Sequence, residues 1–438
     1  MELKRQFGPW TAVSLIVGSV IGVGIFLVPA GMSRAVQSPA WLLAFWLLAG
    51  AMTVCGALAY AEMASRFPHA GGAYVYLRES YGRGAAFLYG WMVLLVLDPG
   101  LTAVFSIGFA NYSEAIVSTS PAVKQLIAIS LVVIGGAISI LGARLNAGFV
   151  TVLTAAKIGT LLVIILAGFL SGRGNAANLD PFFAAPPNLL DALAGGLVGA
   201  FFAFGGWWEV TRITGEVREP ERNIPRALLL GVLIVFIVYV LTSFVFSYLV
   251  PAASITDDGA FAALAGKALF GEIGGGIFAG VVMLSVFGTL FAYMFAAPRV
   301  YFAMARDGLF FRSVGELHQR FGTPHRATLI QMGLAVLLIL SGTFGQVLSY
   351  FYFMVLAFTA LTVLGLFRFS RAAVAGQYRT PFFPVTPILY VLITVVTLVF
   401  IAMKSPIETA IGVGVAGLGV PVYYLFFKRS ATSSSATE

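Results

Sequence analysis

Long apolar runs, separated by short polar segments, recur along the whole chain. The polar segments hold most of the charged residues and many of the prolines and glycines that end helices. A helix needs roughly 20 apolar residues to cross the hydrocarbon core of a bilayer. The pattern therefore predicts twelve transmembrane helices, at about 10–30, 40–64, 84–113, 124–142, 147–170, 195–213, 227–250, 272–304, 328–342, 346–367, 386–402 and 407–427.

Composition strengthens this prediction. Of the 438 residues, 59% are hydrophobic and 10% are charged, an apolar share too large for a soluble protein. A barrel of the outer membrane would show strands of about ten residues that alternate in polarity, and these runs do not alternate. We expect an all-α integral membrane protein with one transmembrane domain, 1–429, and a disordered polar tail, 430–438. The first run is too long for a signal peptide, so we expect it to be retained as the first helix.

The distribution of positive charge predicts the topology. Of the 26 lysines and arginines, twenty fall in loops on the side of the N-terminus, five in loops on the other side, and one, Lys157, inside a run. Since positive loops favour the cytoplasm, we expect both termini to be cytoplasmic in a multi-pass protein of the cytoplasmic (plasma) membrane. The positions of the charges therefore matter more than the net charge of +8, and we expect contact with the lipid bilayer and no binding to nucleic acid.

The few reactive side chains exclude several functions. The one cysteine, Cys55, falls inside an apolar run, so we expect neither an internal disulfide nor a disulfide-linked accessory subunit. The three histidines, His69, His318 and His325, lie in loops without the spacing of metal ligands, and we predict no metal and no cofactor. An intramembrane enzyme would need a nucleophile with its base, or metal ligands, inside the membrane. We therefore predict that the protein is not an enzyme.

Glycines interrupt two of the predicted helices. They occur at 18–24 in the first run and at 205–206 in the sixth, and these two runs open two halves of five helices, about 10–170 and 195–367. Two extra helices follow at about 386–427. Interrupted helices at corresponding positions of two halves point to a midplane binding site in an inverted-repeat transporter. The alternative is that the glycines only allow close packing of helices.

Opened helices expose main-chain groups inside the membrane. After the first break, the N–H groups of the following half-helix attract an anion such as a carboxylate. Before the second break, the carbonyl groups of the preceding half-helix attract a cation such as an ammonium. Together the two breaks suit an amino-acid zwitterion, and the aromatic residues Phe202 and Trp207 beside the second break are candidate gates.

Charged residues in the predicted helices are further candidates. Lys157 lies near the centre of the fifth helix, where an uncompensated lysine costs about 2.5–3.5 kcal/mol. Three roles are open for this lysine. It is a fixed cation in place of a coupling metal ion, it carries a proton, or it is a structural lysine bonded to helix carbonyls. Asp98, in the third helix, pairs with Lys157, lines the side-chain end of the pocket, or faces a water-filled vestibule. Glu62 and Glu209, near cytoplasmic helix ends, are expected to form gate ion pairs with loop arginines such as Arg212.

Several short motifs occur at characteristic places. The most specific are Phe-Ala-Phe-Gly-Gly-Trp at 202–207 and the segment 214–227 that follows it. The others are Ile-Gly-Val-Gly-Ile-Phe at 21–26 and the segments 60–62, 67–68, 71–77, 299–301 and 305–309. Together these motifs resemble those of the amino acid–polyamine–organocation (APC) superfamily of transporters, in particular the L-type amino acid transporter branch, over most of the chain.

This resemblance implies a LeuT-like fold, with a five-plus-five inverted repeat and two added C-terminal helices, that works by alternating access. It implies a carboxylate site at the amides of Val23 and Gly24. It also implies an ammonium site at the carbonyls of Val20, Phe202 and Gly205, over which Phe202 closes. The implied substrate-binding residues are Val20, Ile21, Gly22, Val23, Gly24, Phe202, Ala203, Phe204 and Gly205.

The resemblance also bears on coupling and substrate. Lys157 matches a fifth-helix lysine that occupies the place of a sodium ion in sodium-driven relatives, which implies sodium independence. The sequence departs from the family pattern in three ways. Val23 replaces a usual serine, Trp208 and Glu209 replace polar and aromatic residues, and Asp98 is not part of the pattern. We expect an exchanger or proton symporter of neutral L-amino acids. If Asp98 or Glu209 reaches the pocket, cationic amino acids or polyamines are the alternative substrates. A transport-inactive amino-acid receptor is a third hypothesis.

Overall fold

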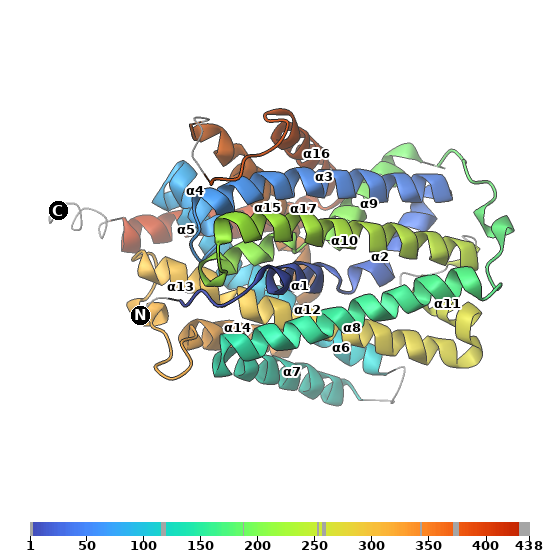
Figure 1. The fold of residues 1–438 in the computed structure, drawn as a ribbon, viewed down its shortest axis with the longest axis horizontal. Helices are drawn as coiled ribbons and strands as arrows, with labels where there is room; N and C mark the ends of the chain where they lie inside the picture. The colour runs from blue at the N-terminus through green and yellow to red at the C-terminus, as the bar shows by residue number, and fades with distance from the viewer. Residues whose placement is uncertain are drawn as a thin grey trace.

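The computed structural model describes residues 3–114, 120–186, 188–251, 254–255, 260–341, 344–370 and 376–428. Every element named within these residues is a helix, and an isolated β-bridge joins Phe7 to Val217. Figure 1 shows the long helices side by side, most of them running along the same axis. The prediction of an all-α protein is therefore confirmed for the described residues.

The first half of the chain forms the helices α1 to α8. They are α1 (Pro9–Val20), α2 (Gly24–Val36), α3 (Pro39–Arg66), α4 (Ala73–Tyr81), α5 (Arg83–Met92), η1 (Val93–Leu97), α6 (Asp98–Ser113), α7 (Pro121–Leu141) and α8 (Ala143–Leu170). The helices α1 and α2 are bent by 44° at the break between them. The helices α5 and α6 join through the π-helical turn η1 into one span of 31 residues. Pro99, which has no N–H to donate to the preceding turn, favours this π-helical turn.

The second half forms the remaining helices. They are α9 (Leu189–Phe204), η3 (Trp207–Glu216), α10 (Pro220–Leu249), α11 (Ala260–Phe270), α12 (Gly274–Ala296), α13 (Pro298–Arg306), α14 (His325–Ser341), α15 (Phe344–Gly365), α16 (Val385–Lys404) and α17 (Pro406–Val422). After two glycines, α9 continues as η3, a 3-10 helix of 10 residues. The helices α4 and α11 are missing from the predicted elements because, at 9 and 11 residues, they are too short to give a long apolar run.

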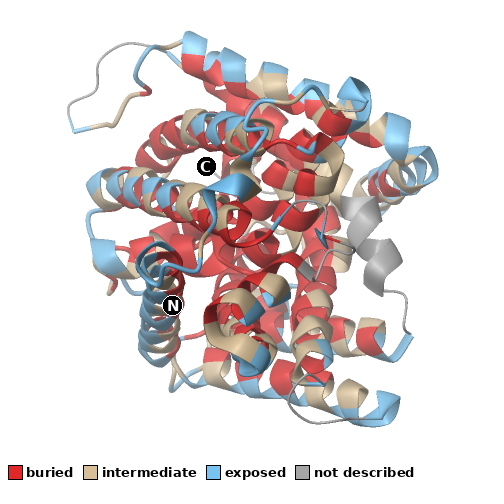
Figure 2. Ribbon diagram, turned by 90° about the vertical axis from the view of Figure 1, so that its right-hand side faces the viewer, coloured by how far each residue is buried: buried red, intermediate tan, exposed pale blue. Residues whose placement is uncertain are grey.

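The outer surface of the helices is apolar. Within the described residues, nine helices are long and apolar enough to cross a membrane, or ten when the bent pair α1 and α2 forms one span. Two shorter apolar helices, His325–Ser341 and Tyr352–Arg368, lie at the ninth and tenth predicted spans. Figure 2 shows buried ribbon in the interior and exposed ribbon on the outer helices. The exposed residues include large apolar ones such as Leu166 and Val396. Such a surface is rare in soluble monomers, so the chain is a multi-pass membrane protein.

The two broken spans lie together in the interior. α1 packs against α8, α10 and α12, while α2 packs against α9 and η3 packs against α1. The helices α2 and α9 approach each other closely, because a Cβ on Gly24 would lie 2.9 Å from the Cα of Ala203. Figure 1 shows the N-terminal segment at the same end of the protein as α4, α5 and α13. The fold thus brings the two glycine-rich breaks, which are far apart in sequence, side by side.

Candidate functional site

The first helix opens at Ile21, Gly22 and Val23. The N–H of Ile21 still donates to the carbonyl of Val17, and that of Gly22 makes a tight bond of 2.8 Å to the carbonyl of Val20. The N–H of Val23 makes no hydrogen bond within the described residues. Since the first N–H groups of any helix lack partners inside it, the start of α2 presents free donors together with the positive end of its dipole.

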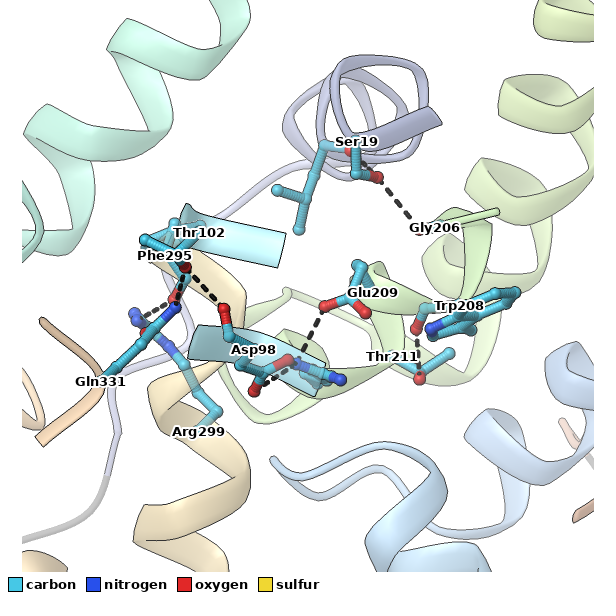
Figure 3. Close-up of polar contacts among 12 residues, drawn as sticks. Ser19, Asp98, Thr102, Gly206, Trp208, Glu209, Thr211, Phe295, Arg299 and Gln331 are labelled. Atoms are coloured by element: carbon cyan, nitrogen blue, oxygen red, sulfur yellow. Dashed lines mark hydrogen bonds and ion pairs between the residues drawn. The ribbon is translucent and has the colours of Figure 1, made fainter. Parts of the chain in front are cut away.

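The sixth span opens at Gly205 and Gly206. Gly206 has a φ of 104°, in the left-handed region that favours glycine. A Cβ at this position would lie 3.0 Å from the Oη of Tyr293 and 3.1 Å from the carbonyl oxygen of Ser19. The hydroxyl of Ser19 donates to the carbonyl of Gly206 at 3.0 Å and so ties the two breaks together (Figure 3). The carbonyl of Gly205 receives no hydrogen bond within the described residues and is a free acceptor.

A cavity of about 50 Å³ lies between the two breaks. Seven of the nine predicted substrate-binding residues line it, namely Val20, Gly22, Val23, Gly24, Phe202, Ala203 and Gly205. The rest of the wall consists of Ser19, Leu97, Leu101, Phe105, Trp208, Thr289, Tyr293, Tyr352 and Val355. The other two predicted residues face elsewhere. The carbonyl of Ile21 meets Lys157, and the ring of Phe204 packs against Trp46 and Tyr239.

The carbonyl groups at the breaks differ in how far they are already bonded. The carbonyl of Val20 accepts from the N–H of Gly22 at 2.8 Å and from the Oη of Tyr239 at 2.9 Å, which uses both lone pairs. The carbonyl of Phe202 accepts from the N–H of Gly205 at 3.1 Å. The free accepting capacity for an ammonium in this structure is therefore at Phe202 and Gly205.

Aromatic side chains form one part of the cavity wall. The rings of Phe202 and Tyr352 meet with their centroids 5.8 Å apart and their planes at 69°. Trp207, predicted as a gate, does not line the cavity but packs on Tyr60 with the ring centroids 4.9 Å apart. Its neighbour Trp208 lines the cavity instead. Tyr352 was absent from the predicted site because one aromatic residue in an aromatic-rich run gives no signal.

Lys157 holds the first break from the side. Its Nζ lies 2.8 Å from each of three acceptors, the carbonyls of Gly18 and Ile21 and the Oγ1 of Thr289. An ammonium has three N–H donors, so all of them are used. The space is tight, because a Cβ on Gly288 would lie 2.5 Å from the Cε of Lys157. Lys157 thus links α8 to the opened end of α1 and to α12.

Asp98 pairs with Arg212. The Nη1 of Arg212 lies 2.8 Å from Oδ1 and 3.0 Å from Oδ2 of Asp98, whose place is shown in Figure 3. The Oη of Tyr301 donates to Oδ2 at 2.9 Å. The pair of Asp98 with Lys157, one of three predicted alternatives, is therefore wrong, and Asp98 does not line the cavity. The ion pair predicted between Glu209 and Arg212 is present, with Oε2 at 3.1 Å from Nη1.

Two further ion pairs lie in the interior. Glu62, which is fully buried, pairs with Arg66 one turn later in α3 at 2.7 Å. Glu216 and Arg299 form a buried pair at 2.7 Å that sequence reasoning missed, and the guanidinium of Arg299 lies 4.2 Å from the ring centroid of Phe295. No group of three or more histidine, cysteine, aspartate and glutamate residues in the described part of the chain is placed to hold a metal ion.

The profile of the amino acid permease family matches residues 7–425. The chain belongs to this family. The serine/threonine exchanger SteT of Bacillus subtilis (strain 168) is 28% identical over 436 residues, which cover 98% of both chains. The human cystine/glutamate transporter is 29% identical over 436 residues, 97% of this chain and 86% of that one. The human large neutral amino acids transporter small subunit 2 is 30% identical over 438 residues, 97% and 81% respectively.

Membership in the amino acid permease family confirms the resemblance drawn from the motifs. It makes the chain an amino-acid transporter and agrees with the expectation that it is not an enzyme. The geometry suits that function, since the cavity lies where two opened spans leave main-chain donors and acceptors unpaired in the interior of a membrane protein.

Proposed function

We propose that this permease is a sodium-independent carrier of neutral L-amino acids that works by alternating access, as an exchanger or a proton symporter. The observation that carries the proposal is the cavity between the two breaks, with an unpaired N–H at Val23 and an unpaired carbonyl at Gly205. A carboxylate can accept a hydrogen bond from this N–H, and an ammonium can donate one to this carbonyl. An α-amino acid zwitterion carries both groups on the same carbon atom.

We infer a LeuT-like arrangement of twelve membrane spans. The apolar helices together with the shorter α14 and α15 give this number, and each of the two broken spans begins a group of five. Both termini are then cytoplasmic in the plasma membrane, as the excess of lysine and arginine on one side favours. Cys55 lies in the middle of α3 rather than in a loop, so we propose that the carrier works without a disulfide-linked subunit.

The cavity wall favours a small, neutral side chain. The part of the wall that would face the side chain of the substrate is mainly apolar and includes Leu97, Leu101, Phe105, Trp208 and Val355. The carboxylates of Asp98 and Glu209 do not line it and face Arg212 instead, so a cationic side chain would find no counter-charge. A volume of about 50 Å³ leaves little room beyond the main chain of the substrate. The relative from Bacillus subtilis is by name a serine/threonine exchanger, which supports substrates of this size.

Lys157 supports sodium independence. The two carbonyls and one hydroxyl around its Nζ are the hard oxygen ligands that a small cation binds. The ammonium already occupies the space between them, and a Cβ on Gly288 would touch it. A bound sodium ion at this place would have to displace the lysine. The break in α1 is thus held open by a covalently attached cation.

Purified protein in lipid vesicles tests the proposal. Vesicles loaded with unlabelled serine should take up labelled serine, and the rate should be equal in sodium chloride and in choline chloride. Competition by each amino acid and by putrescine should rank small neutral amino acids first. Strict sodium dependence would contradict the role of Lys157. Stronger competition by arginine or putrescine than by alanine, serine or threonine would move the assignment to cationic substrates.

A further inference from the structure

Two carboxylates and one guanidinium form a buried cluster beside the cavity (Figure 3). The side chains of Asp98 and Glu209 are 0% exposed and that of Arg212 is 1% exposed. Each acid follows a residue of the cavity wall, since Leu97 precedes Asp98 and Trp208 precedes Glu209. Charges at this depth are screened little by solvent, so their balance matters for the conformations that the carrier adopts.

The guanidinium of Arg212 contacts Asp98 more closely than Glu209. The Nη1 of Arg212 donates to both carboxylate oxygens of Asp98, and Tyr301 donates a third hydrogen bond to the same group. Glu209 accepts no hydrogen bond of comparable geometry within the described residues, although its Oε2 lies 3.1 Å from the same Nη1 and the side chain of Trp208 is close to it. Glu209 is therefore a fully buried carboxyl group that is bonded less well than Asp98.

The charges around Glu209 do not cancel when both acids are ionised. Besides Asp98 and Arg212, the titratable groups that face the cluster are tyrosines, Tyr301 of α13, Tyr89 of α5 and Tyr293 of α12, and they bring no positive charge. The cluster would carry one net negative charge. An uncompensated charge in the interior is far more costly than a neutral carboxylic acid. One bound proton restores the balance.

Glu209 is also connected to the substrate site through the backbone. Its N–H donates to the carbonyl of Gly206 at 3.1 Å, and the same carbonyl accepts from the hydroxyl of Ser19 on α1 at 3.0 Å. Trp208, the preceding residue, lines the cavity. A change at the carboxyl of Glu209 therefore acts on the turn that holds the two broken spans together.

We propose that the carboxyl group of Glu209 binds the proton that is transported together with the amino acid. This inference rests on the proposed function and selects its proton-symport form. When the outer side is open, water that then reaches Glu209 delivers a proton from hydronium to its carboxylate, which becomes a carboxylic acid, and the hydronium becomes one water molecule. When the inner side is open, the acid returns the proton to cytoplasmic water. Arg212, 3.1 Å away, then stabilises the carboxylate that is left. Lys157 keeps its three hydrogen bonds and takes no part in this proton transfer.

The experiment measures protons and substrate in the same vesicles. Purified protein is reconstituted with a pH-sensitive dye inside, and labelled serine is offered from an acidic outer solution. In the wild type, each serine that enters should bring protons, and the acidic outside should drive serine above its equilibrium level. Glu209→Gln keeps the size of the side chain but carries no titratable proton, so the ratio of protons to serine should fall to zero whatever the exchange rate. The matched control Glu316→Gln removes a surface carboxyl, 60% exposed, and should keep the wild-type ratio.

Each outcome decides one point. A wild-type proton ratio in Glu209→Gln overturns the proposal, as does a ratio lost in Asp98→Asn and kept in Glu209→Gln, because the proton then binds Asp98. Wild-type vesicles that exchange serine without moving protons overturn the proton site alone, whereas vesicles that move no serine overturn the proposed function. If Glu209→Gln aggregates, Glu209→Asp replaces it. The shorter acid should shift the pH midpoint of uptake, and an unshifted midpoint overturns the proposal.

Discussion

The Nζ of Lys157 lies 2.8 Å from the carbonyl oxygen of Ile21, the residue at which the first helix opens. The two residues are 136 positions apart in the chain. A lysine near the membrane centre normally extends toward the headgroups, but here three acceptors at 2.8 Å hold the ammonium in the interior. The opened shape of the first span therefore depends on a side chain from α8.

Replacing this ammonium should stop transport. In Lys157→Met a side chain of similar length lacks the charge, so the carbonyls of Gly18 and Ile21 keep hydroxyl donors from α12 but lose their charged donor. A hydrogen bond to a charged group contributes about 1.5–3 kcal/mol. We expect serine uptake to be lost and the apparent melting temperature of the purified protein to fall. Lys124→Met, at the start of α7 where the lysine pairs with Glu114, is the matched control and should behave as wild type. Wild-type uptake in Lys157→Met would leave the lysine without a role in transport.

A substitution in α12 can also disturb the contacts of the Lys157 ammonium with its acceptors. A Cβ on Gly288 would lie 2.5 Å from the Cε and 3.1 Å from the Nζ of Lys157. Gly288→Ala should push the ammonium away from its acceptors, and such overpacking costs about 1–3 kcal/mol. We expect serine uptake to fall, measured as the initial rate per reconstituted protein. Gly280→Ala lies on the same helix in open space and should leave the rate unchanged. Equal rates in the two variants would mean that the pocket of Lys157 tolerates an added methyl group.

The sequence predicts the parts of this site that depend on local signals. Long apolar runs mark the spans, and the glycines at 22–24 and 205–206 mark the breaks, because glycine is the residue that weakens a helix and allows a positive φ. A lone lysine in an apolar run is an equally local signal. These observations place Val23, Gly205 and Lys157 in the interior without any knowledge of packing.

Other parts depend on how helices are rotated against each other. The partner of Asp98 is Arg212, 114 positions away, and nothing near either residue in the sequence favours this pair over one with Lys157. The two tryptophans show a second effect. After Gly206, at a φ of 104°, the chain continues as a 3-10 helix with 3.0 residues per turn rather than 3.6, so the directions of its side chains change. Trp208 then lines the cavity, and Trp207, the predicted gate, packs against Tyr60.

Trp208 should limit the size of the substrate. Its side chain is part of the cavity wall, next to Gly205. Trp208→Ala removes the ring and enlarges the cavity, so larger neutral amino acids such as leucine and phenylalanine should compete better against labelled serine than they do in the wild type. Trp10→Ala removes a ring that is 70% exposed and should keep the wild-type order of competitors. An unchanged order in Trp208→Ala would show that another part of the wall sets the size limit.

Arg212 should contribute to stability because it balances buried negative charge. Arg212→Gln leaves Asp98 and Glu209 in the interior without a cation, and breaking a buried ion pair by removing one partner costs about 3–5 kcal/mol. We expect a large fall in the apparent melting temperature of the purified protein. Adding Asp98→Asn removes the charge of Asp98 that is left without a cation, so the double variant should melt above Arg212→Gln alone. Arg326→Gln breaks an exposed pair with Glu316, worth about 0–1 kcal/mol, and serves as the control. If the double variant melts below Arg212→Gln, the carboxylate of Asp98 stabilises the fold through the hydrogen bond that it accepts from Tyr301 rather than through Arg212.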